Sequence, residues 1–476
     1  MTKIHNIARN TSYLTLALIL QKIISFTYFI ILTRALGVAS MGQYYAAISF
    51  TTIFAIFIDL GFANTLTREV AKDQAKATDW LGNVVALKIP LSLITIILAV
   101  IFAFIFGYDS LSFQLILISA ISMVLDSFTS TFFAAARGFH NLKYESIASV
   151  IFQLIVLVFG YLALFNGYGI KMAMAVLALA SIFNFIYSFF IVRYRLNLIW
   201  RPVWQKEFVK NIFRISWPFA LFAILQRLYT YLDSVMISVL SGYHQVGVYQ
   251  IAFKIIFALQ FLPSAFTASL YPAMSSYWLH NREQLALSFK RAMNYLIIIS
   301  MPIIGGVIAL DDKIVGLFKA GPEAIWPLRI SILALFFIFV NFPIGSLLNA
   351  CDRQRKNLLF MAIITVISIL SNAFLIPRYG ATGASMTVLA TTAIMFFLGI
   401  REVKHIIDYK AKENFATLGK ALWAAALMGT IVYYGKNYLP IIVATILGGM
   451  LYFIFMYLVG GFKKQDIRSV YLSFKR

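Results

Sequence analysis

The sequence predicts an all-α protein that crosses a membrane about fourteen times. Apolar residues make up 61% of the 476 residues and charged residues only 12%, a composition far too apolar for a water-soluble domain. Long apolar runs, each close to the roughly 20 residues that a bilayer-spanning helix needs, follow one another with short polar loops between them. An internal repeat then divides the helices into two pseudo-symmetric six-helix lobes, followed by two extra C-terminal helices.

The first lobe is predicted to occupy residues 1–192. The chain begins with "MTKIHNIARNTSYLTLALIL", which runs directly into a full-length apolar span, so no cleavable signal peptide is expected. Six spans are predicted near residues 11–32, 41–66, 83–106, 112–136, 146–165 and 170–192.

A basic segment, residues 193–212, forms the predicted cytoplasmic linker between the lobes. Its sequence "RYRLNLIWRPVWQKEF" (193–208) mixes Trp and Arg, which suits a helix lying in the membrane interface. A solvated basic loop fits the same residues equally well, and the sequence leaves both open.

The second lobe is predicted over residues 213–400, and residues 401–476 hold two further helices and a cytoplasmic tail. The spans are expected near residues 213–241, 246–276, 293–310, 325–350, 358–376, 382–400, 419–435 and 438–459. The last two are the shortest.

The repeat appears when residues 19–47 are aligned without a gap on residues 224–252, an offset of 205. Seven of the 29 aligned residues are identical, and Lys22 falls on Arg227. A second similarity links residues 168–181 with 379–392. Because the halves are separated by an even number of spans, they share one orientation and are related by a pseudo-two-fold axis along the membrane normal. Transporters built in this way bind substrate near the midplane.

The net charge of +22 follows the predicted loops. Most of the 40 Lys and Arg residues fall in the N-terminal segment, the even-numbered loops and the C-terminal tail. This is the positive-inside pattern, so both termini are expected to be cytoplasmic. The basic charge therefore faces the anionic lipid of the cytoplasmic membrane, and no nucleic-acid partner is expected.

Two cations lie deep inside predicted spans. Lys22 is 11 residues into its span and Arg227 is 14, about 17 Å and 21 Å along a helix. A charge at that depth costs several kcal/mol unless it meets a partner or water. Each also lies on a helix face of small and polar residues, so both are expected to face a wet cavity, where they would hold an anionic head group together with Lys254.

Two acidic residues also lie inside predicted spans. Asp126 and Asp233 are candidates for ion coupling, because a carboxylate inside the membrane can bind and release a proton or sodium ion. Internal salt bridges are the alternative, for example Lys22 with Asp126 or Lys254 with Asp233. Lys88 lies near the predicted cytoplasmic edge and is expected to extend its amine to the interface.

A cationic cavity predicts an anionic substrate such as a phosphate or acidic sugar, and Arg suits phosphate through its planar fork. One Cys and five scattered His predict no metal site. The sequence contains no G-x-x-x-x-G-K-[ST] motif, so direct use of ATP is not expected. No cofactor is predicted, and short basic loops without an acidic catalytic segment argue against an enzyme.

Four stretches resemble a known family: "LTRALGVASMGQYYAAISF" (32–50), "DLGFANTLTREVAKD" (59–73), "AAARGFHNLKY" (134–144) and "LDSVMISVLSGYHQVGVYQIAFKI" (232–255). They are similar to the polysaccharide-biosynthesis flippases, or O-antigen-unit translocases, of the multidrug/oligosaccharidyl-lipid/polysaccharide exporter superfamily. The resemblance covers essentially the whole chain, and its motifs are structural, so they identify the family and not the sugar.

The resemblance implies fourteen helices, alternating access and outward translocation of a polyprenyl-pyrophosphate-linked oligosaccharide. It also implies membrane lipids, and proteins of polysaccharide assembly, as partners. A flippase for a cell-wall lipid precursor remains open because its head chemistry is the same. A cation-coupled multidrug exporter is disfavoured by the basic bias of the intramembrane charges.

Overall fold

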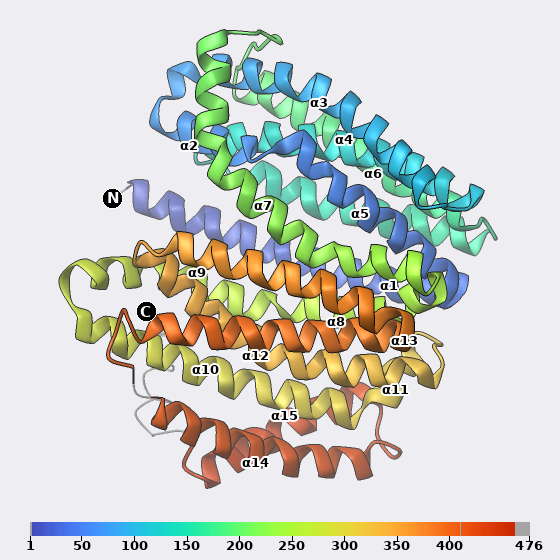
Figure 1. Ribbon diagram of the computed structural model, residues 1–476, viewed down its shortest axis with the longest axis vertical. Coiled ribbons are helices and arrows are strands. Elements are labelled where there is room, and N and C mark those ends of the chain that lie inside the picture. The colour runs from blue at the N-terminus through green and yellow to red at the C-terminus, as the bar shows by residue number, and fades with distance from the viewer. Residues whose placement is uncertain (1, 410, 462–476) are drawn as a thin grey trace. The chain divides into compact units, whose positions relative to one another are not determined.

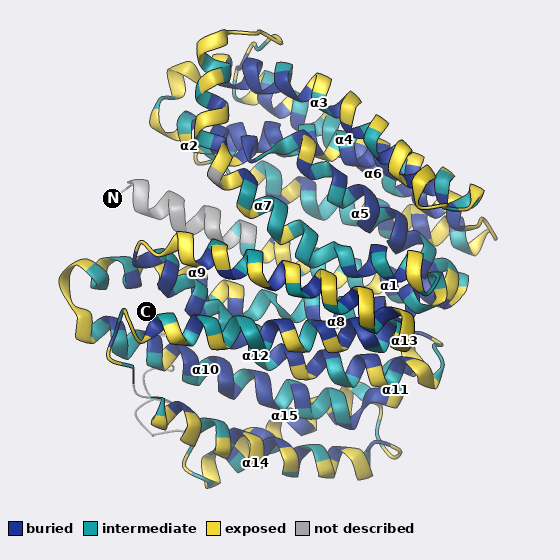
Figure 2. Ribbon diagram, in the orientation of Figure 1, coloured by how far each residue is buried: buried dark blue, intermediate teal, exposed yellow. Residues whose placement is uncertain are grey.

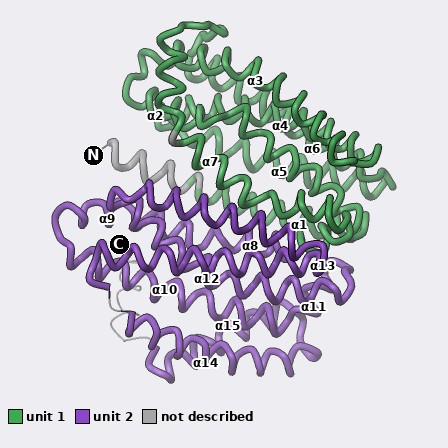
Figure 3. Tube along the Cα trace, in the orientation of Figure 1, with its two compact units in different colours: residues 1–250 green, residues 251–476 purple. Residues whose placement is uncertain are grey.

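The computed structural model describes residues 2–409 and 411–461, which form helices joined by short loops and contain no strand. The chain divides into two compact units, residues 1–250 and 251–476 (Figure 3). The predicted all-α membrane fold is confirmed by this architecture.

Unit 1 contains the first seven helices and the start of the eighth (Figure 1). Their bounds are α1 (Thr2–Asp59), α2 (Phe62–Lys72), α3 (Ala77–Ile105), α4 (Ser110–Gly138), α5 (Lys143–Phe165), α6 (Ile170–Phe190), α7 (Lys206–Leu240) and α8 (Tyr243–Leu259). A 3₁₀ turn, η1 (Gln74–Lys76), precedes α3, and a π turn, η2 (Ile191–Arg195), ends α6.

Unit 2 contains the remainder of α8 and the helices that follow. Their bounds are α9 (Phe261–His280), α10 (Arg282–Ala309), α11 (Asp311–Leu317), η3 (Pro322–Ala324), α12 (Ile325–Ala350), α13 (Gln354–Val403), α14 (Lys412–Gly435) and α15 (Ile441–Leu458). Its buried core takes residues from α8, α9, α10, α12, α13, α14 and α15. Within it Tyr452 is fully buried and donates a hydrogen bond of 2.8 Å to the carbonyl oxygen of Ile298.

Many of the helices are long and apolar enough to span a bilayer. Eleven qualify within the described residues, or twelve if the two parts of α7, bent by 50°, count as one span. At 1.5 Å per residue the 58 residues of α1 and the 50 of α13 are each far longer than the roughly 30 Å apolar core of a bilayer. Each is interrupted by a glycine outside helical geometry, Gly37 and Gly380. The protein is a multi-pass membrane protein, and the number fourteen stays a prediction.

The repeat predicted from sequence has a geometric counterpart within unit 1. Gly37 and Gly242, which align at the offset of 205, both adopt a left-handed backbone, with φ of 82° and 84°. Gly42 and Gly247 also align and pack reciprocally: a Cβ on Gly42 would lie 1.9 Å from the Tyr243 carbonyl oxygen, and one on Gly247 would lie 2.0 Å from that of Val38. Val38 and Tyr243 are themselves one repeat apart, so the contact has local two-fold symmetry.

The boundary of the two units differs from the boundary of the predicted lobes. The lobes, residues 1–192 and 213–400, divide the chain by internal similarity and stay a prediction. By spatial compactness α7 belongs with the first unit, which ends at Gln250.

The sequence leaves open an interfacial helix or a solvated basic loop for the linker, and the structure shows a non-helical segment in its middle. Residues 196–205 have no helical structure and lie as a strap against α3 and α4. The Gln205 backbone N–H donates to Asn83 Oδ1 at 2.8 Å, and Asn83 Nδ2 donates to Gln205 Oε1 at 3.2 Å. The Trp200 ring packs on Phe132 at 5.4 Å. These contacts tie the non-helical segment to α3 and α4.

Buried and exposed residues are distributed as a bilayer requires. Phe62, Leu66, Leu81 and Phe132 belong to the buried core at one end of unit 1. Large apolar side chains such as Phe104 and Phe165 are exposed on helix surfaces, and exposed residues run along much of α14 (Figure 2). In a bilayer these side chains contact lipid, so their exposure carries no hydrophobic cost.

Candidate functional site

A polar cavity of about 300 Å³ lies inside unit 1 between α1, α4, α6 and α7. Its walls are mostly hydroxyl-bearing and charged side chains, which are rare inside an apolar helix bundle. The lining residues are Ile48, Thr51, Thr52, Ala55, Asp59, Ser119, Ser122, Met123, Asp126, Ser127, Ser130, Leu177, Arg227 and Tyr231.

Helical periodicity explains how α1 and α4 supply most of these side chains. Ser119, Ser122, Asp126 and Ser130 follow one another at spacings of three and four, so they occupy one face of α4. On α1, Thr51 and Thr52 lie on the facing side, and Thr51 Oγ1 is 2.7 Å from Ser119 Oγ. Thr51 Oγ1 also donates to the Ala47 carbonyl oxygen at 3.1 Å, whereas the buried Ser122 hydroxyl has no hydrogen-bond partner among the described residues.

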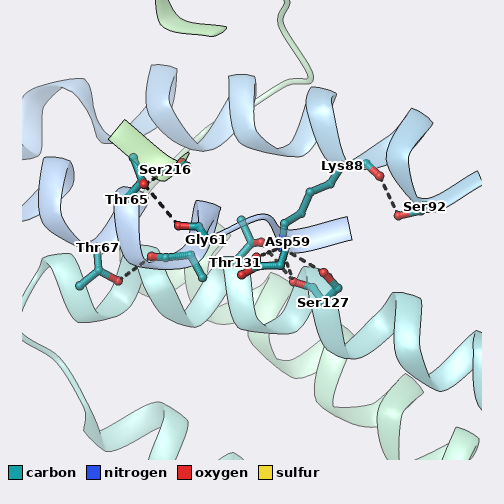
Figure 4. Close-up of polar contacts among 10 residues, drawn as sticks. Asp59, Gly61, Thr65, Thr67, Lys88, Ser92, Ser127, Thr131 and Ser216 are labelled. Atoms are coloured by element: carbon teal, nitrogen blue, oxygen red, sulfur yellow. Dashed lines mark hydrogen bonds and ion pairs between the residues drawn. The ribbon is translucent and has the colours of Figure 1, made fainter. Parts of the chain in front are cut away.

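Asp59 and Lys88 form an ion pair beside the cavity (Figure 4). Lys88 Nζ lies 2.5 Å from Asp59 Oδ1 and also donates to the Ser127 carbonyl oxygen and hydroxyl, at 2.9 and 3.1 Å. The Lys88 side chain is 0% exposed, so the expectation that its amine reaches the interface is wrong. A charge-matched partner and two further acceptors offset the cost of removing this ammonium from water.

Arg227 enters the cavity from α7. Its Nη1 donates to the Thr52 carbonyl oxygen at 3.2 Å, which holds the guanidinium against α1. Asp126 also lines the cavity and is exposed to it. The structure therefore brings together two of the five site residues predicted from sequence. Arg227 is one of the three predicted to bind the head group, and Asp126 is one of the two predicted to couple transport to an ion.

The other three predicted residues lie elsewhere. Lys22 is half-buried on α1 and is not among the residues lining this cavity, and Lys254 is half-buried on α8 in unit 2. Asp233 is buried, and its Oδ2 accepts a hydrogen bond of 2.8 Å from the Tyr249 hydroxyl. Their proposed roles stay predictions.

Sequence reasoning missed the Asp59–Lys88 pair and the serine face of α4. The serine face was visible as a spacing of three and four on either side of Asp126. The pair was not visible, because its two partners are 29 residues apart on different helices. No group of three or more His, Cys, Asp or Glu that could hold a metal ion occurs among the described residues.

Comparison with known proteins identifies the family. The family model described as polysaccharide biosynthesis protein matches residues 7–278, more than half of the chain. The chain belongs to the polysaccharide biosynthesis protein family. A second family model, MatE, matches residues 218–376.

Two relatives of this family member are similar over most of their lengths. It is 20% identical to the probable low-salt glycan biosynthesis flippase Agl15 of Haloferax volcanii over 94% of both chains. It is 22% identical to the capsular polysaccharide biosynthesis protein CapF of Staphylococcus aureus, over 80% of this chain and 95% of that protein.

Solved structures show the same fold in transporters. The lipid II flippase MurJ in an inward closed conformation superposes with a TM-score of 0.77 at 16% identity, covering 94% of this chain and 98% of that one. An inward-facing multidrug resistance MATE transporter of the MOP superfamily gives a TM-score of 0.64 at 14% identity, covering 81% of this chain and 95% of that one. At these identities the likeness establishes the fold of this family member.

Proposed function

We propose that this protein is a flippase that carries a polyprenyl-(pyro)phosphate-linked oligosaccharide across the cytoplasmic membrane by alternating access, for surface polysaccharide biosynthesis. The family and the relatives that are named as flippases support this proposal. The observation that carries the choice of an anionic substrate is Arg227, a guanidinium in a polar cavity midway along an apolar helix.

Arg227 is suited to a phosphate. A guanidinium has five N–H donors in a planar fork, and the Thr52 carbonyl oxygen accepts from one nitrogen of Arg227. The remaining donors can bind two phosphate oxygens at once, a geometry that a lysine ammonium cannot reproduce. Sugar units would occupy the hydroxyl-lined part of the cavity, beside the ring of Tyr231.

Asp126 would couple head-group binding to a cation. Asp59 is neutralised by Lys88, so Arg227 and Asp126 are the two remaining opposite charges in the cavity lining. An arriving phosphate and the Asp126 carboxylate compete electrostatically for Arg227. A proton or sodium ion on Asp126 relieves that competition, so anion and cation would favour each other's binding by the same factor.

Transport of labelled polyprenyl-pyrophosphate-linked sugar in proteoliposomes tests the proposal. Arg227→Ala should abolish transport while the protein remains inserted and folded, and Arg227→Lys should restore only part of it. Arg214→Ala is the matched control, because Arg214 is an exposed arginine of α7 outside the cavity. Full activity in Arg227→Ala would refute the anionic-site proposal. Transport of a cell-wall lipid precursor, measured in the same vesicles, decides between an oligosaccharide flippase and a flippase for that precursor.

The same vesicles test coupling. Asp126→Asn should retain substrate movement but lose its response to an imposed pH or sodium gradient, and Asp233→Asn tests the other predicted acid in parallel. If both variants respond to the gradient as the unmodified protein does, neither carboxylate couples transport. Consumption of the product outside would then set the direction.

A further inference from the structure

A second recess lies on the surface of unit 1, along the last turns of α6. It has a volume of about 360 Å³ and is mostly aromatic and aliphatic. Its lining residues are Phe183, Ile186, Tyr187, Phe190, Ile191, Tyr194 and Arg195.

This recess faces away from the polar cavity. Leu177 is the α6 residue that lines the cavity. Ile186 follows nine residues later, which is two and a half turns at 3.6 residues per turn, so it points to the opposite side of the helix. Ile186 and Phe190 are 46% and 49% exposed, as expected for side chains that contact lipid tails.

The walls of the recess are built from stacked rings. Phe183 stacks on Tyr187, with ring centroids 6.0 Å apart and an angle of 24° between the ring planes. Phe190 stacks on Tyr194, with centroids 5.6 Å apart and an angle of 19° between the planes. The two rings of each pair are one helical turn apart, so two stacked pairs follow one another along the helix, and together they are called the ladder. A ladder of flat, stiff rings offers an extended apolar surface for a hydrocarbon chain.

Arg195 closes one end of the ladder. It lies in the π turn that ends α6, lines the recess and is exposed. The described part of the chain contains no carboxylate paired with Arg195. By the predicted topology this is the cytoplasmic end of α6, at the depth of the lipid head groups.

We propose that this recess binds an anionic phospholipid of the cytoplasmic leaflet, with one acyl chain along the rings and the phosphate on the Arg195 guanidinium. An apolar ladder that ends in an unpaired cation complements a molecule with a hydrocarbon chain and an anionic head. The lipid-facing side of α6 favours a resident phospholipid over the transported lipid, whose head group must reach Arg227 on the other side of the helix.

Native mass spectrometry of the full-length protein tests this site, with phosphatidylglycerol and phosphatidylcholine as the probes. The unmodified protein should bind phosphatidylglycerol more tightly than phosphatidylcholine. Arg195→Gln should weaken phosphatidylglycerol binding about fivefold, the effect of one cation near a lipid head group, and should leave phosphatidylcholine binding unchanged. Ile186→Trp, which fills the recess, should weaken both lipids.

The control is Arg201→Gln, which removes an exposed arginine of the same basic segment that does not line the recess. Equal losses of phosphatidylglycerol affinity in Arg195→Gln and Arg201→Gln would show that the lipid is attracted by the overall basic charge of the segment, and would overturn the proposed site. Unchanged phosphatidylglycerol binding in Arg195→Gln would also overturn it. Displacement of phosphatidylglycerol by polyprenyl phosphate at equal concentration would reassign the recess to the transported lipid. None of these results depends on transport, so the outcome is separate from the proposed function.

Discussion

Lys88 shows what a single buried charge requires in this protein. Its ammonium is enclosed by Asp59 and two oxygens of Ser127, so removal of either charge leaves the other without its partner. Lys88→Met should therefore lower the free energy of unfolding by about 3 kcal/mol, at the lower end of the range for a broken buried pair because Asp59 is partly exposed to the cavity.

Denaturant unfolding in detergent measures this loss. The double variant Lys88→Met with Asp59→Asn removes both charges and should recover part of the stability. A double variant less stable than Lys88→Met alone would contradict the pairing, because it would mean that Asp59 stabilises the fold without Lys88.

Asp109, in the loop before α4, gives the fold a pH dependence. Burial raises its pKa, but hydrogen bonds from the Ser112 and Tyr243 side chains and from the Ser112 backbone outweigh it, so the pKa lies below its usual value. The Tyr243 hydroxyl donates to it at 2.7 Å. The ionised carboxylate therefore stabilises the fold above the ordinary pKa of about 3.9, and this stability is lost as the pH falls through the lower native value.

Asp109→Asn should accordingly lower the unfolding temperature at pH 7 and reduce the further loss of stability on acidification below about pH 4. Thermal unfolding across that range measures both effects. An Asn variant as stable as the unmodified protein at pH 7 would show that these hydrogen bonds add nothing to the folded state.

Individual residues differ in how far the sequence predicts them. Arg227 and Asp126 stand out because each is a charge deep in an apolar run, and both prove to line one cavity. The predicted position of the Lys88 amine at the interface is wrong because distance along the chain from a membrane edge does not reveal a partner on another helix. Lys22 matches Arg227 in the alignment but does not line that cavity, so equivalence in the repeat does not guarantee a shared site.

At the scale of helices, the reciprocal glycines of α1 and α8 decide how closely two backbones approach. A methyl group on Gly42 would lie 1.9 Å from the Tyr243 carbonyl oxygen, and backbone cannot rotate away as a side chain does. Gly42→Ala should therefore destabilise the protein by about 1–3 kcal/mol, the usual effect of overpacking. Gly419→Ala is the control, because a Cβ there meets no atom within 4 Å, and it should be neutral or slightly stabilising.

Unfolding of the two alanine variants in detergent compares the sites directly. Equal stability of Gly42→Ala and Gly419→Ala would contradict the close approach. The repeat in the sequence predicted that Gly42 and Gly247 are equivalent, but not that they touch. It also did not predict the strap at residues 196–205, which is held in part by Asn83, more than a hundred residues earlier in the chain.

At the scale of the whole molecule, the distribution of charge predicts orientation. Two cations lie at helix ends that are predicted to be outside, Arg329 on α12 and Lys436 after α14. Acids of α11 neutralise both: Asp311 pairs with Arg329, and Asp312 pairs with Lys436 at 2.8 Å. The loops on the predicted cytoplasmic side retain an excess of Lys and Arg. Composition and loop charge therefore predict a membrane topology from the sequence alone, whereas pairing inside the bundle depends on contacts between residues far apart in the sequence.

Cysteine labelling from outside the cell tests the orientation. Ser110→Cys, Gly242→Cys and Ala320→Cys should each react with a membrane-impermeant maleimide, because all three lie at helix junctions predicted to be external. His280→Cys, at the exposed end of α9, should react only after permeabilisation. Cys351 is buried, and burial raises the pKa of its thiol to about 11, so it should react slowly even in permeabilised cells and is replaced by Ala in each variant. Labelling of Gly242→Cys only after permeabilisation would show that α7 and α8 have the opposite orientation to the predicted one. The Arg195 recess would then lie on the outer side of the membrane.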